Sequence, residues 1–184
     1  FLIFIVVLGI ESARQTVARL KKGRRMEELE QFALNDSMTG MYNRNAYDYF
    51  VKNEKDFEGY VIVTFDLNNL KQCNDQYGHR AGDEYIINAA HIIEDNFERY
   101  GKCYRIGGDE FCCIIPKGRY FKIERVMHKI DQDVEILNHK NIIPVPVGIA
   151  YGYAVFTADD TDPEKVRERA DKDMYRNKKA MKQS

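Results

Sequence analysis

The sequence has almost no net charge. Its 184 residues include 28 Lys and Arg and 29 Asp and Glu, which gives a formal charge of −1 at pH 7. Attraction of a nucleic acid polymer or an anionic membrane to a whole domain requires a clear excess of positive charge. We therefore expect no nucleic acid polymer as a partner, and any phosphate must be bound by a local group of residues.

Cysteine and histidine are scarce, with four of each. The cysteines form no C-x-x-C pair, and the adjacent Cys112 and Cys113 would point to opposite faces of a strand. We expect neither a zinc site nor a disulfide framework, as is usual for a protein of the reducing cytosol. The spacing of the histidines indicates no shared metal, and no internal repeat or low-complexity segment is found.

The chain opens with the apolar run FLIFIVVLGI, without a starting methionine. Residues 1–10 cover about half of the roughly 20 residues that a spanning helix needs. Basic side chains dominate residues 11–25, as on the cytoplasmic flank of a membrane helix. We interpret 1–10 as the end of a transmembrane helix, which predicts membrane attachment and makes the rest the cytoplasmic domain of an inner-membrane protein. A secretory apolar region or a short apolar helix packed on the domain are the alternatives.

Residues 11–33 predict a helical linker, in which only Gly23 favours a break. Its apolar positions are compatible with a dimerising signalling helix. They are equally compatible with a solvated linker, because the apolar stripe never completes three heptads.

Helical and strand patterns alternate in the remaining residues, 34–184. Helical periodicity is found at 43–52, 82–100, 123–137 and 163–182, and strand patterns at 59–67, 102–106, 110–115 and 145–156. From the first strand the order is β-α-β-β-α-β. This order predicts an α+β domain of the split βαβ, ferredoxin-like type, with an antiparallel sheet, helices on one face and the N-terminal helix before it.

Three carboxylates are expected to meet at one edge of this sheet. The strand 59–67 ends beside Asp66, and a hairpin delivers Asp109 and Glu110 at its tip. Such crowding of like charges is tolerated if divalent cations bind there, and ligands that are all oxygen favour Mg²⁺ or Mn²⁺. Paired metals on carboxylates serve phosphoryl and nucleotidyl transfer. The alternative is a plain solvent-exposed turn.

Gly107 and Gly108 stand in this hairpin, before the acids. We expect them to permit positive φ in a tight turn and to keep side chains off the surface on which a nucleotide would lie.

Four motifs occur in order along the chain: DSMTGMYNR at 36–44, FDLNNLKQCNDQYGHRAGD at 65–83, RIGGDEF at 105–111 and ADKDMYRNKKAMK at 170–182. With them the sequence resembles the GGDEF-domain family, the diguanylate cyclases that join two GTP molecules into cyclic di-GMP. The resemblance runs from about Leu34 to Lys182, within the predicted catalytic domain, 34–184. It implies the palm-type sheet of nucleotide cyclases, two Mg²⁺ or Mn²⁺ ions per site, and a homodimer, because one domain holds one GTP and the product needs two.

The resemblance also implies individual roles. The metal ligands correspond to Asp66, the backbone carbonyl of Leu67, Asp109 and Glu110. The catalytic residues correspond to Asp109, Glu110 and Lys71. We give Asp109 a metal-binding role first and a role as proton acceptor second, because a metal-bound carboxylate is a weak base. Without the motif around it, Lys71 would be read as a lysine that solvates a helix start.

Guanine recognition corresponds to Asn74 and Asp83, with His79 beside the base. A carboxylate suits the two parallel N–H donors of guanine, whereas adenine offers no such pair. The alternatives are an N-cap role for Asp83 and a helix-packing role for His79.

Phosphate contacts correspond to Arg105 and Lys178, and Gly107 and Gly108 belong to the same nucleotide-binding surface. Lys182 stands where the family commonly has arginine, so the charge is kept and the bidentate geometry is lost. Asp36 and Arg44 are expected to pair at the entry of the domain.

Many family members carry an inhibitory Arg-x-x-Asp site for the product before the hairpin. The matching positions here are Glu98 and Gly101, which predicts no product inhibition through that site. Two further classes stay open, a catalytically silent GTP-binding regulatory module and a dimerising structural unit.

Overall fold

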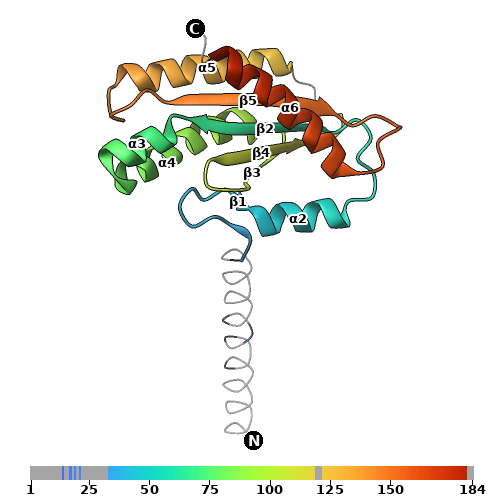
Figure 1. Cartoon of the computed structure of the whole chain (residues 1–184). Helices are drawn as coiled ribbons and strands as arrows, with labels where there is room; N and C mark the ends of the chain where they lie inside the picture. The colour runs from blue at the N-terminus through green and yellow to red at the C-terminus, as the bar shows by residue number, and fades with distance from the viewer. Residues whose placement is uncertain are drawn as a thin grey trace, which may run out of the picture.

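Buried side chains follow one another without alternation in the two central strands, IVTF in β2 (Val61–Asn68) and FCCII in β4 (Glu110–Ile115), and all of them except Thr64 are apolar. Such runs are stable only where both faces of the sheet are covered. The structure is a computed structural model that describes Arg14, Val17, Arg19, Lys21 and residues 33–118 and 122–181. In these residues helices lie on both faces of one central sheet (Figure 1).

Five strands form one sheet in the order β1-β3-β4-β2-β5. The other strands are β1 (Tyr42–Asn43), β3 (Lys102–Arg105) and β5 (Gly148–Val155). β2 pairs antiparallel with β4 and β5, and β3 pairs antiparallel with β4. The predicted α+β fold with its split βαβ core is confirmed. The short β1, which runs parallel to β3, makes the sheet mixed.

Helices cover both faces of the sheet, so the expectation of helices on one face is wrong. The described helices are α2 (Arg44–Asn53), α3 (Leu70–Tyr77), α4 (His79–Phe97), α5 (Ile123–His139) and α6 (Pro163–Met181). One core joins α4 and α5 to the face that carries Val63 and Phe65. The second core joins α2 and α6 to the face that carries Ile62 and Cys112.

The helix α6 lies directly on β5, at Gly152. A Cβ atom at Gly152 would be 2.0 Å from the backbone nitrogen of Met174, so only glycine permits this approach. The close contact holds α6 across the sheet face of Ile62, and the last turns of α6 reach the end of β2 (Figure 1).

Two features differ from the expected elements. A separate helix, α3, precedes α4, and α4 begins at His79 rather than at residue 82. Gly78, with φ of +81°, separates the two helices.

The predicted transmembrane end, 1–10, lies outside the described residues, as does most of the linker 11–33. Arg14, Val17, Arg19 and Lys21 are helical and exposed. Among the helices that the structure describes, none combines the length and the apolar character needed to cross a bilayer.

Candidate functional site

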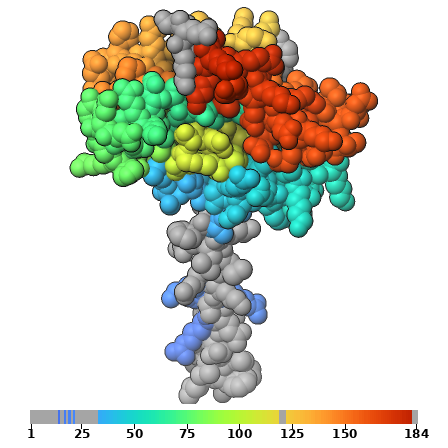
Figure 2. Space-filling view, in the orientation of Figure 1, coloured from blue at the N-terminus to red at the C-terminus, as the bar shows by residue number. Residues whose placement is uncertain are grey.

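The acids from the second and third motifs meet where β2 and β4 end together. Asp66 and Glu110 are directly opposite each other in the last antiparallel pair of these strands. The N–H of Leu67 donates to the carbonyl of Asp109 at 3.1 Å, so Asp109 adjoins the next residue of β2. Because the N–H and C=O of one strand residue point the same way, the Leu67 carbonyl also faces the hairpin. Figure 2 shows this hairpin at the surface, between α3 and α4 on one side and α6 on the other.

Lys178 of α6 compensates this concentration of negative charge. Its ammonium forms an ion pair with Asp66 Oδ1, and the two side chains are 23% and 16% exposed. Opposed like charges destabilise an antiparallel pair, so a cation at this position stabilises the strand ends. Lys178, to which the motif assigns a phosphate contact, is therefore paired with Asp66 in this structure.

The donors fit a divalent cation in kind. Asp66, Asp109, Glu110 and the Leu67 carbonyl offer only oxygen, which suits Mg²⁺ or Mn²⁺ rather than zinc. The ammonium of Lys178 already occupies a cation's position beside Asp66. However, among the described residues no three Asp, Glu, His or Cys side chains gather closely enough to hold a metal ion. Asp66, Asp109 and Glu110 are therefore adjacent along the backbone, whereas the expected close approach of their three carboxylates is not found in the described residues.

Lys71 lies in the first turn of α3, directly after a sharp change in chain direction. Asn69 adopts the left-handed conformation, with φ of +62°, and Leu70 begins the helix. This turn leads the chain from the Leu67 carbonyl to Lys71 within four residues. The Lys71 side chain is exposed, free to reach a ligand at the end of β2.

Asn74 of α3 lies against the residue of α4 that precedes Asp83. A Cβ atom at Gly82 would lie 1.9 Å from Asn74 Oδ1, so the Asn74 amide rests on Gly82, the residue before Asp83. Asp83 is exposed, and it is the fifth residue of a helix whose N-cap is Gly78. The alternative N-cap role for Asp83 is therefore wrong. His79 is exposed at the start of α4, which also excludes the helix-packing role.

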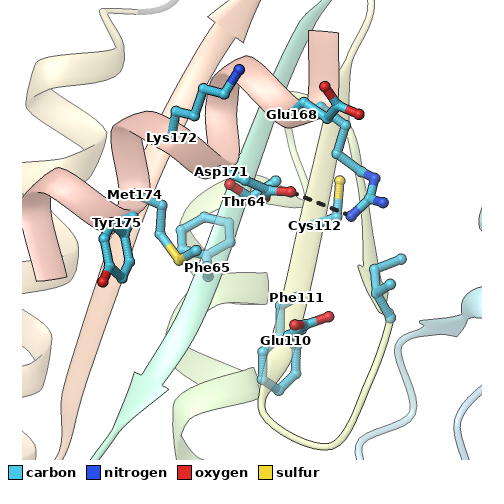
Figure 3. Close-up of a pocket in the computed structure, with 12 residues that line it drawn as sticks. Thr64, Phe65, Glu110, Phe111, Cys112, Glu168, Asp171, Lys172, Met174 and Tyr175 are labelled. Carbon is cyan, nitrogen blue, oxygen red and sulfur yellow. Dashed lines mark ion pairs between the residues drawn. The ribbon is translucent and has the colours of Figure 1, made fainter. Parts of the chain in front are cut away.

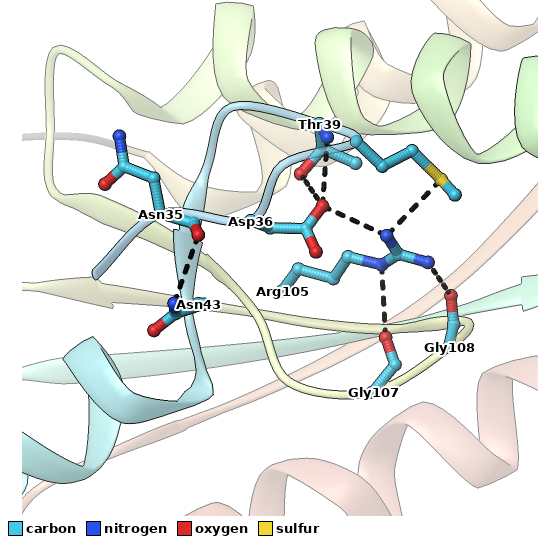
Figure 4. Close-up of polar contacts among 8 residues, drawn as sticks. Asn35, Asp36, Thr39, Asn43, Arg105, Gly107 and Gly108 are labelled. Carbon is cyan, nitrogen blue, oxygen red and sulfur yellow. Dashed lines mark hydrogen bonds and ion pairs between the residues drawn. The ribbon is translucent and has the colours of Figure 1, made fainter. Parts of the chain in front are cut away.

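Arg105 braces the hairpin to the entry of the domain (Figure 4). Its Nε donates to the Gly107 carbonyl at 3.2 Å and one terminal nitrogen to the Gly108 carbonyl at 2.9 Å. The other terminal nitrogen is 3.0 Å from Asp36 Oδ1. All three guanidinium nitrogens are thus engaged within the protein, which gives Arg105 a structural task beside the phosphate contact that the motif implies.

The expected pairing of Asp36 with Arg44 is wrong. Arg44 instead lies 3.9 Å from the exposed Asp48, one turn along α2. Asp36 accepts hydrogen bonds from the backbone N–H and the hydroxyl of Thr39 as well as from Arg105.

Asp36 is expected to make the domain sensitive to acid. Burial would raise the pKa of Asp36, but hydrogen bonds from Thr39 and Arg105 outweigh burial and hold the pKa below its usual value of about 4. A lowered folded-state pKa stabilises the fold above the unfolded-state pKa, and this stability is lost as the pH falls through the folded-state pKa. Asp36→Asn should lower the free energy of unfolding at pH 7 by roughly 1–2 kcal/mol, and by progressively less below about pH 4.

Urea unfolding at pH 7 and at pH 3.5 measures this difference. Asp48→Asn, which removes an exposed acid, should change the free energy of unfolding little at either pH. An Asp36→Asn deficit that is the same at both pH values would contradict the assignment.

The glycines of the hairpin have only one of the two predicted properties. Neither Gly107 nor Gly108 has φ in the left-handed region, so the expectation that they permit positive φ is wrong. A Cβ atom at Gly108 would meet nothing within 4 Å, so this side of the hairpin is open. Lys182 lies outside the described residues.

A cavity of about 510 Å³ continues from Glu110 along the sheet, beneath α6 (Figure 3). Arg167 in its wall is 3.5 Å from Asp171 and 2.9 Å from Glu164. Burial raises the pKa of Asp171, with weaker opposing effects of Thr64 and Arg167. Because α6 pairs its own arginine and acids here, the cavity offers a mainly apolar extension of the site. No sequence pattern indicates this cavity, since its lining is contributed by separate elements.

A five-stranded α+β sheet with acids at the shared end of two central strands and a lysine paired with one of them defines the class of this domain, a split βαβ fold with an acidic site at its sheet edge. The family model described as "Diguanylate cyclase, GGDEF domain" matches residues 33–184. The chain belongs to the GGDEF-domain family.

Relatives agree with this assignment. The chain is 30% identical over 172 residues to the bifunctional diguanylate cyclase/cyclic di-GMP phosphodiesterase MucR of Pseudomonas aeruginosa, over 89% of this chain and 24% of MucR. It is 29% identical over 158 residues to the diguanylate cyclase DgcS of Shewanella oneidensis, over 83% of this chain and 52% of DgcS. The chain thus spans about half or less of these relatives.

Among solved structures, the coiled coil and GGDEF domain of DgcB from Caulobacter crescentus, in complex with c-di-GMP, is similar in fold. Its TM-score is 0.77 at 23% identity, and the match covers 94% of this chain and 95% of that chain.

Proposed function

We propose that this chain is a diguanylate cyclase. It condenses two GTP molecules into cyclic di-GMP, with release of two pyrophosphates. The observation that carries the proposal is the placement of Asp66 opposite Glu110, with Lys178 at the acids and the Asn74–Asp83 pair at the adjoining helices. A structural unit would need no such combination.

In this proposal each group of site residues binds a different part of the substrate or the metal ions. Asn74 and Asp83 hold guanine, with His79 beside it, and Lys71 and Lys178 bind phosphate oxygens. Asp66, the Leu67 carbonyl, Asp109 and Glu110 would hold Mg²⁺ or Mn²⁺, two ions per site. Such ions stabilise the charge that develops on the attacking and leaving oxygens. Asp109 has a second task, acceptance of the proton from the attacking 3′-hydroxyl.

Two domains must face each other for this reaction. Each 3′-oxygen forms a bond to the α-phosphorus of the other GTP, each bond from that phosphorus to pyrophosphate breaks, and each hydroxyl loses its proton. Because one domain holds one GTP, activity depends on a homodimer, and positioning supplies most of the rate enhancement. In this proposal residues 1–10 attach the chain to a membrane, and the N-terminal segment regulates how often two domains meet. Rates strictly proportional to protein concentration across the dimer transition would count against this.

A direct assay separates the three functional classes. The protein is incubated with GTP and Mg²⁺ or Mn²⁺, and pyrophosphate and cyclic dinucleotide are measured, with Asp109→Ala as the control. Formation of both by the wild-type protein only is expected. GTP binding without turnover would indicate the silent regulatory module, and neither binding nor turnover would indicate a structural unit.

The silent module is the second candidate because relatives differ in activity. The cyclic di-GMP phosphodiesterase PdeR of Escherichia coli is 29% identical over 155 residues, so membership of the family does not itself fix the reaction. The cyclase is favoured because the hairpin retains both acids, each placed at the end of β2.

We predict that cyclic di-GMP does not inhibit the enzyme through the segment before the hairpin. A Cβ atom at Gly101 would lie 2.1 Å from the backbone oxygen of Ile114, so the aspartate of an Arg-x-x-Asp site does not fit there without movement of β4. Initial rates with added cyclic di-GMP should show at most competition with GTP. Non-competitive inhibition that disappears on substitution of residues 98–101 would contradict the prediction. Gly101→Asp should destabilise the fold rather than create an inhibitory site.

A further inference from the structure

Tyr85 lies on the buried side of α4, two residues after Asp83. Its side chain is fully buried in the core between the sheet, α4 and α5. Burial raises the pKa of Tyr85, so the hydroxyl keeps its proton and acts as a neutral donor. A buried hydroxyl needs hydrogen-bond partners, and the partners of this one lie far away in the sequence.

The Tyr85 hydroxyl joins the ends of two strands. It donates to the carbonyl of Asn68, the last residue of β2, at 2.5 Å. It accepts a hydrogen bond from the N–H of Gly148, the first residue of β5, at 2.7 Å. Asn68 and Gly148 are opposite each other in the sheet, so one side chain of α4 holds both strand ends at this point.

The Asn68 carbonyl belongs to a critical peptide of the site. This peptide connects Asn68 to Asn69, whose left-handed backbone starts the turn into α3. The Leu67 carbonyl lies immediately before it and Lys71 shortly after. A non-glycine residue in the left-handed region persists where its surroundings hold it, and the hydrogen bond from Tyr85 supplies such support.

We propose that Tyr85 is a positioning residue for the condensation of GTP. Its hydroxyl orients the Asn68–Asn69 peptide, and thereby sets the Leu67 carbonyl and Lys71 relative to the helix that carries Asp83. The Tyr85 hydroxyl thereby fixes the position of the guanine-binding residues relative to the phosphate-binding residues. This inference rests on the proposed function.

The test compares Tyr85→Phe with Tyr47→Phe in the full chain. Tyr47 is equally a buried tyrosine, but its hydroxyl bonds to Glu164 at 3.3 Å, in the other core. Both variants lose one hydroxyl and keep the ring. Folding is checked by circular dichroism, and rates are measured at a temperature at which both variants are folded.

Three readouts are expected to separate the variants. Tyr85→Phe should lower kcat by about tenfold or more with KM for GTP within about twofold, because the fault lies in the alignment of bound groups. Binding of a non-hydrolysable GTP analogue should require a several-fold higher Mn²⁺ concentration for half-saturation in Tyr85→Phe than in the wild-type protein. Amide hydrogen exchange of residues 67–71 and of Gly148 should be roughly tenfold faster. Tyr47→Phe should show none of these changes.

Each outcome decides. Equal losses in both variants, or exchange at 67–71 and Gly148 unchanged in Tyr85→Phe, would overturn the inference. If the wild-type protein makes no cyclic dinucleotide, the proposed function fails, and the role of Tyr85 is then judged from the analogue binding and the exchange. In that case faster exchange together with weaker metal-dependent binding, confined to Tyr85→Phe, still supports it as the residue that orients this turn.

Discussion

Asp66→Asn is expected to reduce the formation of cyclic di-GMP by at least about 100-fold. The substitution keeps the shape of the side chain and removes the negative charge that the cation would meet at the end of β2. Metal ions contribute several kcal/mol to the stabilisation of transition-state charge, and each 1.36 kcal/mol corresponds to a factor of ten in rate. Neither of the two neighbouring acids can take this place, because Glu110 belongs to the adjacent strand and Asp109 to the turn.

The fold of this variant should survive. The substitution would leave Lys178 without its ion-pair partner, but the Lys178 side chain is 23% exposed and can turn towards solvent. We expect the Tm to change by no more than about 5 °C. Asp48→Asn, in an exposed ion pair on α2, is the matched control and should keep activity within about twofold. A folded Asp66→Asn protein with more than about a tenth of wild-type turnover would refute the assigned role.

Asp83→Asn is expected to lower kcat/KM for GTP by about 100-fold. A carboxylate accepts from both N1–H and the N2 amino group of guanine, whereas an amide offers one oxygen and turns a donor towards a donor. Hydrogen bonds to charged groups contribute about 1.5–3 kcal/mol, and 1.4 kcal/mol is tenfold in affinity. Asp83 is exposed and directly follows Gly82, against which the Asn74 amide lies, so its carboxylate is accessible to a base.

Inosine triphosphate, which lacks the N2 amino group, sharpens this test. The wild-type protein should prefer GTP over inosine triphosphate, and Asp83→Asn should lose most of this preference. Glu84→Gln changes the adjacent acid of the same helix, which is 3.8 Å from Arg80, and should leave both substrates unaffected. An undiminished preference for GTP in Asp83→Asn would show that another residue reads the base.

The sequence predicted those parts of the site that lie within continuous motifs. Asp66, Asp109 and Glu110 could be placed at one sheet edge because strand patterns and a hairpin turn are local signals. The contacts of Arg105 with Asp36 and of Tyr85 with Gly148 could not, since 69 and 63 residues separate the partners. Hydrophobic pattern contains no information on which backbone groups a distant polar side chain will meet.

The helices that cover the sheet likewise divide into those that the sequence could predict and one that it could not. The predominantly apolar runs of β2 and β4, which do not alternate, are typical of strands buried on both faces, so helices on both faces of the sheet could have been predicted from the sequence. The helix α3 was not predicted, because it has only eight residues, and the helical spacing of Leu70, Cys73 and Tyr77 is too short a pattern to distinguish a helix from a loop.

The hairpin is mechanically attached to the point at which the chain enters the domain. The Arg105 guanidinium holds the Gly107 and Gly108 carbonyls with two of its nitrogens and Asp36 with the third, while the Asn43 side chain donates to the carbonyls of Ala33 and Asn35. A displacement of residues 33–36 would therefore either move the hairpin that carries Asp109 and Glu110 with it or break the ion pair between Arg105 and Asp36.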